Sequence, residues 1–240
     1  MQTGMGYDRY LTFINCQIKP GKVGRSRRSE STRFRAITIS RESGSGAHDI
    51  ASRLAAALQT KAPGGKRPWT VFDKELVTQV LEDHHFPARM AEFIPEDRRN
   101  ELQGAIEEMF GLRPSSWTLI QHMSETILRL VELGNVILIG RGANVVVQGR
   151  KDVLHIRLTG SLEVRAARVA AARNMSQQKA KETVLKEDRG RARYLKKYLE
   201  ADIDDPLLYH ATFNTDLVPS DRVVELIVQL MATDTQPESE

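Results

Sequence analysis

The amino-acid sequence predicts a three-layer α/β domain, in which helices cover both faces of a parallel sheet. Three observations lead to this prediction. Strand-like and helix-like segments alternate from Phe34 onward, which is the order found in domains with a parallel sheet. The segment NVILIG, residues 135–140, is a continuous apolar run, as expected for a central strand that is buried on both faces. Glycine-rich turns follow the first and third expected strands, at the sheet edge where this architecture binds ligands.

The first elements follow from local patterns. The segment AITIS, within residues 34–40, is short and rich in β-branched residues, which predicts a buried strand. Apolar residues at helical spacing predict a helix over 49–58. Glycine and proline interrupt regular structure over 61–68, and WTVFD, residues 69–73, predicts a second strand. The segment KELVTQVLEDHH, residues 74–85, predicts the helix that follows.

Similar patterns predict the remaining elements of the chain. Because helices separate the expected strands, the crossovers between them are expected to be right-handed. In order, the elements are a mostly helical region over 88–133 with breaks near Gly111 and Pro114, strands over 135–140 and 153–160, a helix opened by Ser161, a basic helical region over 165–199 interrupted near Met175 and Ser176, a strand within 207–216 and an amphipathic helix over 220–231.

Composition limits the class of protein. The chain has 240 residues, of which 40% are hydrophobic, and a formal net charge of +4. This length predicts one or two domains with a core that needs no disulfide or bound metal. Cys16 is the only cysteine, which excludes an internal disulfide and is typical of a reducing cytosol. No apolar run approaches the roughly 20 residues that span a bilayer, and no signal-peptide pattern opens the chain. We therefore expect a cytoplasmic protein without a membrane partner.

The two ends of the chain differ in composition from its centre. Much of the positive charge lies in KPGKVGRSRRSESTRFR, residues 19–35. Such a run is either an arm for nucleic acid or acidic partners, or a solvated extension. No aromatic residue interleaves the serine–arginine run, so nucleic-acid binding is not favoured. We expect 1–33 to be a disordered basic extension, 34–231 to form the folded domain and 232–240 to be a disordered tail.

The first glycine turn is a candidate phosphate-binding loop. Glycines in SGSG, residues 43–46, allow backbone amides to turn toward an anion, and the following helix adds the positive end of its dipole. The standard loop is G-x-x-x-x-G-K-[ST]. If Gly46 is its second glycine, Arg41 replaces the first glycine, Ala47 the lysine and His48 the serine or threonine. Three of the four defining positions differ, so the motif alone also fits a plain glycine-rich turn.

Several arginines are candidates for phosphate binding. Arg141 lies just beyond the third expected strand, in IGRGAN, and KEDRGRARYLKKY contains Arg189, Arg191 and Arg193. The planar guanidinium group suits phosphate oxygens, although a solvated basic helix face gives the same cluster. On one helix, residues 189 and 193 share a face and residue 191 lies on another. We therefore expect Arg189 and Arg193 to face the cleft and Arg191 to point away, unless the chain leaves helical geometry at Gly190, whose helix propensity is weak.

Five blocks occur in the order found in a known family. They are SRESGSGA (40–47) followed by Ile50 and Ala51, FDKEL (72–76), IGRGAN (139–144), DRGR (188–191) and FNTD (213–216). From about Ala36 to Met231, the chain resembles the cytidylate kinase-like family, a branch of the P-loop nucleoside monophosphate kinases.

This resemblance implies a P-loop NTPase fold with a helical acceptor-binding insertion at about 84–120 and an arginine-rich lid at about 174–204. It implies ATP as donor, Mg²⁺ as metal, and CMP or dCMP as nominal acceptor. Arg141 would meet the acceptor phosphate, and Asp73 would orient the acceptor, unless it only caps the following helix. The lid arginines 189, 191 and 193 would stabilise the moving phosphoryl group. The donor phosphates would lie against Ser43, Gly44, Ser45, Gly46 and Ala47, with His48 and Asp49 at the start of the helix.

The chain also departs from the family pattern. True cytidylate kinases have the loop lysine where this chain has Ala47, and an aspartate where it has Ile139. We expect Arg41 to supply the missing charge as a catalytic residue, unless it forms only a surface salt bridge. We expect Asp49 to help hold Mg²⁺ through water.

Two alternatives remain at this point. One is a nucleotide-binding pseudo-kinase. The other is a kinase for a different small acceptor, bound by residues 86–111. The six histidines show no metal-ligand spacing, and nothing in the sequence indicates an oligomeric state.

Overall fold

A computed structural model describes residues 34–61, 68–73 and 116–232. The described residues form a parallel five-stranded sheet with strand order β2-β3-β1-β4-β5. This confirms the predicted α/β class. The strands are β1 (Ala36–Arg41), β2 (Thr70–Phe72), β3 (Val136–Ile139), β4 (Val153–Thr159) and β5 (Ala211–Asn214).

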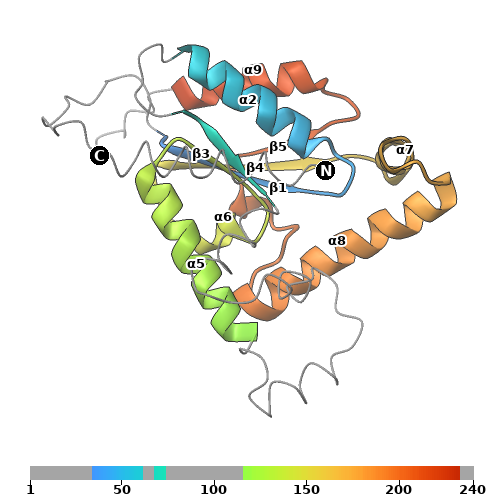
Figure 1. Cartoon of the computed structure of the whole chain (residues 1–240), viewed down its shortest axis with the longest axis horizontal. Coiled ribbons are helices and arrows are strands. Elements are labelled where there is room, and N and C mark those ends of the chain that lie inside the picture. The colour runs from blue at the N-terminus through green and yellow to red at the C-terminus, as the bar shows by residue number, and fades with distance from the viewer. Residues whose placement is uncertain (1–33, 62–67, 74–115, 233–240) are drawn as a thin grey trace, which may run out of the picture.

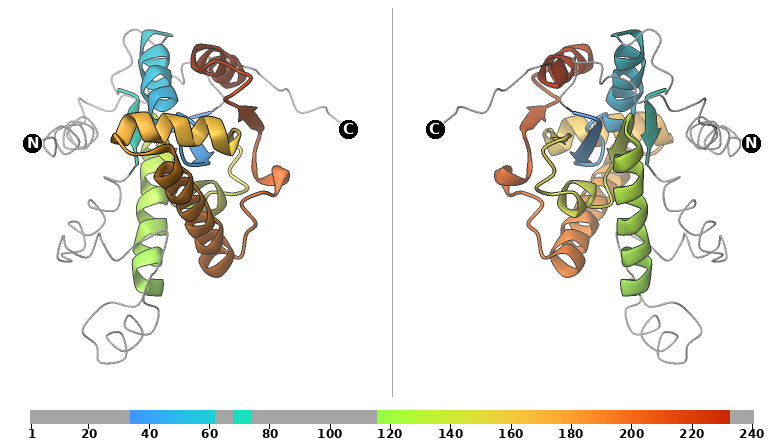
Figure 2. Two further views of the ribbon diagram at one scale, coloured as in Figure 1. Left: turned by 90° about the vertical axis from the view of Figure 1, so that its right-hand side faces the viewer. Right: turned by 90° about the vertical axis from the view of Figure 1, so that its left-hand side faces the viewer.

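Helices cover both faces of the sheet, which confirms the three-layer architecture. Figure 1 shows α2 (Ala47–Lys61) and α9 (Ser220–Ala232) on one face, with α5 (Ser116–Leu133) and the short α6 (Ala143–Val146) on the other. The helix α7 (Leu162–Arg173) lies beyond the carboxyl end of β4, and α8 (Gln177–Leu199) runs from it back toward α5. A short 3₁₀ helix, Pro206–Leu208, precedes β5. The side views in Figure 2 show the same layers.

Alternate residues of β1 enter two different cores, as expected for a central strand. Ile37 and Ile39 pack with α2 and α9, whereas Ala36 packs with α5 and α6. A third cluster joins Ile120 of α5 to Tyr194 of α8. The helix α8 is therefore anchored in the layer that also contains α5.

The predicted break in the basic helical region is confirmed. The helix α7 ends at Asn174, which adopts a left-handed conformation with φ 49°. Ser176 then caps α8 by accepting a hydrogen bond from the backbone N–H of Lys179 at 3.3 Å. Ser161 occupies the N-cap position of α7, as predicted, but its side chain makes no capping bond. The backbone N–H of Ser161 instead donates to Asp216 at 2.6 Å.

Some predicted features lie outside the described residues. They are the N-terminal extension, the helix expected over 74–85, most of the acceptor-binding insertion and the C-terminal tail. Within the described ranges, no helix combines the length and apolar character needed to cross a membrane.

A buried histidine links the centre of the sheet to its edge. Nδ1 of His155 on β4 lies 2.8 Å from the hydroxyl of Thr38 on β1, and the backbone N–H of His155 donates to Nδ1 of His210 at 3.0 Å. Burial, and next the charge of His210, lower the pKa of His155 from 6.5 to about 4. This histidine is therefore neutral in the folded protein at neutral pH.

We predict that folding stability depends on this histidine between pH 6.5 and pH 4. The unfolded chain binds a proton at His155 near pH 6.5, whereas the folded protein resists it down to about pH 4. The stabilisation is present above pH 6.5 and is lost as the pH falls toward 4, by about 2–3 kcal/mol. Urea unfolding at pH 7.5 and pH 4.5 measures it. In the His155→Gln variant, the free energy of unfolding should fall by about 2–3 kcal/mol less between pH 7.5 and pH 4.5 than in the unmodified protein. An equal fall in both proteins would contradict the prediction.

Candidate functional site

The glycine turn between β1 and α2 presents backbone donors at the start of a helix. Gly44 and Gly46 have φ values of 80° and 82°, which glycine adopts without steric cost. No described residue accepts a hydrogen bond from the amides of Gly44, Gly46 or Ala47. Backbone N–H groups at a helix N-terminus are well suited to bind an anion. The turn therefore has the chemistry predicted for it.

The two glycines of this turn have different surroundings. A Cβ atom at Gly44 would overlap the backbone carbonyl of Arg165 on α7, whereas one at Gly46 would meet nothing within 4 Å. Gly44 is thus needed where the turn approaches α7. Gly46 faces open space, as a residue over a phosphate site should.

We predict that Gly44→Ala destabilises the protein more than Gly46→Ala. Both variants force alanine into the left-handed region, at about 1–2 kcal/mol. Only Gly44→Ala also forces α7 away from the turn, which adds about 1–3 kcal/mol. Urea unfolding of both variants checks the difference. Equal losses of stability would show that the turn and α7 separate easily.

Arg165 joins the glycine turn to α8. The residue is 5% exposed, and its side chain donates from Nη1 to the carbonyl oxygen of Ser43 at 2.8 Å. It also forms ion pairs with Asp188 of α8 at 2.7 Å and with Glu42 at 3.3 Å. Nε donates to the carbonyl oxygen of Gly160 at 2.8 Å. A buried guanidinium requires such a set of partners, and here it links three segments that are distant in the sequence.

Two carboxylates of α8 contact the glycine turn directly. Oδ1 of Asp188 accepts from the backbone N–H of Ser43 at 2.7 Å and from Arg191 at 2.7 Å. Glu187 accepts from the Ser43 hydroxyl, and from Arg173 at 2.8 Å. Burial is the largest influence on the pKa of Glu187 and raises it, but the hydrogen bonds from Arg173 and Ser43 outweigh burial and keep this pKa below its ordinary value. Both acids therefore hold α8 against the glycine turn.

The second glycine turn follows β3 and presents Arg141. Gly140, Arg141 and Gly142 have φ values of 75°, 56° and 66°. A Cβ atom at Gly140 would overlap the guanidinium of Arg41, and one at Gly142 would overlap Leu199 of the lid. Arg141 itself is held in a left-handed conformation that costs about 1–2 kcal/mol for a residue with a Cβ. Strain of this kind is concentrated at functional sites.

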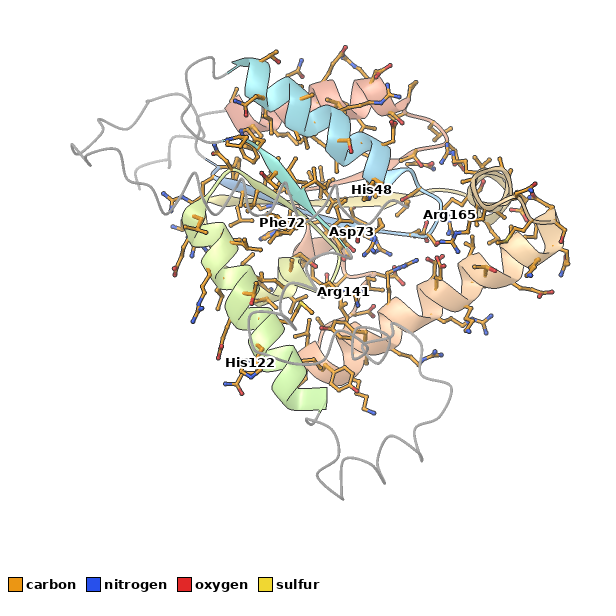
Figure 3. The ribbon with its side chains drawn as sticks, viewed as in Figure 1. His48, Phe72, Asp73, His122, Arg141 and Arg165 are labelled. Carbon is orange, nitrogen blue, oxygen red and sulfur yellow. The ribbon has the colours of Figure 1, made fainter. Side chains whose placement is uncertain are left out.

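Asp73 connects the two turns. It follows β2 directly, and its carboxylate lies 3.4 Å from Arg41 and 3.3 Å from Nδ1 of His48. Burial is the largest influence on the pKa of Asp73 and raises it. The hydrogen bond with His48 and the charges of Arg41 and Arg141 together outweigh burial, so this pKa lies below its ordinary value. Figure 3 shows Asp73 between His48 and Arg141. An ionised carboxylate thus lies among cationic groups at the sheet edge.

The sheet register brings these parts together. β1 and β3 are paired in parallel with Ile39 opposite Ile139, so the two glycine turns leave the same edge of the sheet side by side. A family model, the cytidylate kinase-like family, matches residues 36–217. The chain belongs to the cytidylate kinase-like family. The α/β fold described above is the P-loop kinase fold of that family.

Several solved structures are similar to this cytidylate kinase-like protein. An uncharacterized protein from Eubacterium ventriosum ATCC 27560 is 18% identical, with a TM-score of 0.60 over 84% of this chain and 99% of that chain. A shikimate kinase from Bacteroides thetaiotaomicron is 15% identical, with a TM-score of 0.47 over 82% and 98% of the two chains. A gluconokinase from Sinorhizobium meliloti 1021 is 13% identical, with a TM-score of 0.44 over 82% and 93%. No curated protein matches the chain.

The predicted facing of the lid arginines is wrong for this family member. The helix α8 continues through Gly190, so Arg189 and Arg193 lie on one side as expected, but that side is exposed. Arg191 is 7% exposed and pairs with Asp188. The apolar face of α8 decides the orientation. Positions 184, 188, 191 and 195 share a face, and Val184 and Leu195 are buried. That spacing was visible in the sequence and could have identified Arg191 as the inward arginine.

The remaining predicted site residues fall into two groups. Arg41 is partly buried against Gly140 and Asp73, so its salt bridge lies inside the site and not on the surface. Asp49 is bound by Arg53 at 2.8 Å, and Arg53 also binds Asp221 of α9 at 2.7 Å. The structure therefore brings Arg41, His48, Asp73 and Arg141 together and engages Asp49 elsewhere.

The donor set at the turn fits Mg²⁺ poorly. Mg²⁺ demands oxygen ligands, and the standard loop supplies a hydroxyl oxygen where this chain has the imidazole of His48. Among the described residues, no group of three histidine, cysteine, aspartate or glutamate side chains could hold a metal ion. The carboxylate predicted to assist, Asp49, is occupied by Arg53.

Proposed function

We propose that this protein transfers the γ-phosphoryl group of ATP to a nucleoside monophosphate of the CMP or dCMP class. The observation that carries the proposal is the adjacency of the two glycine turns. One turn offers backbone donors at the start of α2, and the other presents Arg141 beside Asp73. A donor triphosphate and an acceptor phosphate at these two turns would face each other across one sheet edge.

The donor site in this proposal is the turn from Ser43 to Ala47. Its amides and the dipole of α2 hold the β- and γ-phosphates. Ala47 cannot supply the positive charge of the usual lysine. Arg41, whose guanidinium lies between the two turns, supplies a positive charge near the transferred group.

The acceptor site in this proposal is formed by Arg141 and Asp73. Arg141 binds the acceptor phosphate, for which its forked guanidinium group is suited. Asp73 accepts a hydrogen bond from the acceptor and holds Arg41 in place. Phosphoryl transfer then needs the acceptor oxygen in line with the bond that breaks, and electrostatic stabilisation of the moving group, without a covalent nucleophile on the protein. Arg191, the inward lid arginine, provides part of that stabilisation.

A second function, nucleotide binding without transfer, is favoured by a specific observation. Ser43, the first residue of the turn, is bound through its amide by Asp188 and through its hydroxyl by Glu187. Lid acids at a phosphate-binding turn oppose the approach of a triphosphate. The absence of the loop lysine at Ala47 points the same way.

One experiment separates the two functions. A panel of nucleoside monophosphates is incubated with ATP and a divalent cation, ADP formation is measured, and ATP binding is measured separately by calorimetry. ADP formation with one pyrimidine monophosphate supports the kinase, whereas ATP binding without turnover supports the pseudo-kinase. In the Arg141→Ala variant, the kinase should lose turnover and retain its ATP affinity. Turnover in that variant at the unmodified rate would remove Arg141 from the acceptor site.

A further inference from the structure

A buried asparagine lies three residues after Arg141, in the short helix that follows the second glycine turn. Asn144 belongs to α6, whose N-cap is Gly142, and is 4% exposed. Its side-chain nitrogen, Nδ2, is buried and has no hydrogen-bond partner among the described residues. Buried polar side chains are paired in the large majority of cases, because an unpaired buried donor lowers stability. The amide of Asn144 is therefore an exception that calls for an explanation.

Packing alone does not account for an amide at position 144. The other residues of α6 are apolar. Ala143 and Val146 pack with α5 and the sheet, and Val145 packs against α8. An apolar side chain of similar size at position 144 would pack between the same layers without burying an unpaired donor. The polar group is better explained by a partner that binds from outside the chain.

The helical position of Asn144 directs its side chain toward the turn that presents Arg141. In an α-helix, the bond from Cα to Cβ is tilted toward the amino end, so a side chain covers the turn that precedes its own residue. The turn that precedes Asn144 consists of Gly140, Arg141 and Gly142, all with left-handed backbones. A ligand bound at this turn would therefore have the buried amide as a neighbour.

The helix α8 covers this turn. A Cβ atom at Gly142 would overlap Leu199 and would lie 3.7 Å from Cε1 of Tyr194. Both residues belong to the apolar cluster between α5, α6 and α8. In a place shielded from water, a hydrogen bond is electrostatically stronger than in solution, and a bond to a charged acceptor is stronger than a neutral one. An anion enclosed here would gain from the Asn144 donor.

We propose that Asn144 is a further acceptor-binding residue, and that its Nδ2 donates a hydrogen bond to a phosphate oxygen of the nucleoside monophosphate. The proposal rests on the proposed function, which assigns that phosphate to Arg141. The phosphate reaches the amide when α8 moves away from Gly142, and the return of α8 encloses it. Because all nucleoside monophosphates share the phosphate, Asn144 contributes to affinity and not to the choice of base.

The test is calorimetric titration of the full chain with CMP, dCMP and other nucleoside monophosphates, and separately with ATP. We expect Asn144→Ala to weaken the binding of each monophosphate by about 10- to 100-fold, as for one hydrogen bond to a charged group. The affinity for ATP should stay unchanged, because ATP binds at the other glycine turn in the proposed function. Asn144→Asp keeps the shape of the side chain but replaces the donor with a carboxylate oxygen, so its loss should be larger. This variant tests the donor even if Asn144→Ala does not fold.

Val147→Ala is the matched control. Val147 is the C-cap of α6, is 1% exposed and packs in the same core as Ala143. This variant loses buried side-chain atoms without losing a donor, so it should bind monophosphates like the unmodified protein. In urea unfolding, Asn144→Ala should lose less stability than Val147→Ala, because it also removes an unpaired buried donor. A larger loss in Asn144→Ala would show that the amide already has a partner in the ligand-free protein, and would overturn the proposal.

The binding outcomes distinguish this proposal from the proposed function. Unchanged monophosphate affinity in folded Asn144→Ala or Asn144→Asp overturns the role of Asn144 and leaves the proposed function standing. A loss that depends on the base, or an equal loss in Val147→Ala, also overturns it. The amide would then read the base, or α6 would act through its packing alone. A folded unmodified protein that binds no nucleoside monophosphate overturns both.

Discussion

We expect a Gly46→Val protein to fold but no longer to bind ATP. The Cβ of the new side chain enters the open space above the turn, where nothing lies within 4 Å. It does occupy the space through which a phosphate must approach the backbone donors. Loss of two or more charge-assisted hydrogen bonds weakens ATP binding by on the order of 100-fold or more. Calorimetric titration of ATP into the folded variant measures this loss.

Gly149→Val is the matched control for this experiment. Gly149 has φ 84° and also meets nothing within 4 Å, so the backbone strain is the same as at Gly46 with φ 82°. It lies between α6 and β4, away from the glycine turn. Gly149→Val should bind ATP like the unmodified protein. Unchanged ATP affinity in folded Gly46→Val would instead remove the turn from the nucleotide site.

Replacement of Arg191 by alanine should have the largest effect on turnover among the lid arginines. Arg191 is buried beside Asp188, whose carboxylate also binds the amide of Ser43. It is therefore held near the glycine turn, where the proposed function places the donor phosphates. Lid arginines act mainly on charge that develops during transfer, so we expect kcat to fall by about 100- to 1000-fold with a smaller change in ATP affinity. Steady-state kinetics with the acceptor identified by the monophosphate panel measures it.

Arg189→Ala is the comparison for the lid. Arg189 is exposed, and its Nε donates to the carbonyl oxygen of Leu185 in the preceding turn of α8 at 3.2 Å. Loss of the Arg189 side chain should change kcat by no more than about twofold. Surface substitutions usually have free-energy effects of at most about 0.5 kcal/mol. Urea unfolding of both variants shows whether Arg191→Ala remains folded under assay conditions. Full turnover in folded Arg191→Ala, with a large loss in Arg189→Ala, would restore the facing expected from helix spacing alone.

The elements that could be predicted are those specified by local sequence. The buried run 135–140 and the β-branched segment at 36–40 became central strands because their patterns agree with burial on both faces. The helix break near Ser176 followed from its capping chemistry. The position of the glycine turn also followed, since a strand, glycines and a helix are adjacent in the chain.

The contacts that could not be predicted are those between distant segments. The residues next to Ser43 in the sequence do not predict its contacts with Glu187 and Asp188. The residues next to Asp73 likewise do not predict its contact with His48. These pairs depend on how α8 crosses the sheet edge and on the strand order, which fix side-chain neighbours only after folding. The facing of the lid arginines failed for a different reason. The spacing of the arginines alone does not determine which side of α8 is buried, because the apolar residues Val184 and Leu195 decide it.

The ion pairs of Arg165 also constrain how this protein can evolve. A buried arginine that loses Asp188 or Glu42 keeps a charge that water cannot reach, and both acids lose an ion pair when the arginine is lost. Single substitutions at these positions should therefore be rare among descendants of one ancestor, and compensated changes more common. Relatives that lack an arginine at the position of Arg165 are expected to lack the acidic residues at positions 42 and 188 as well.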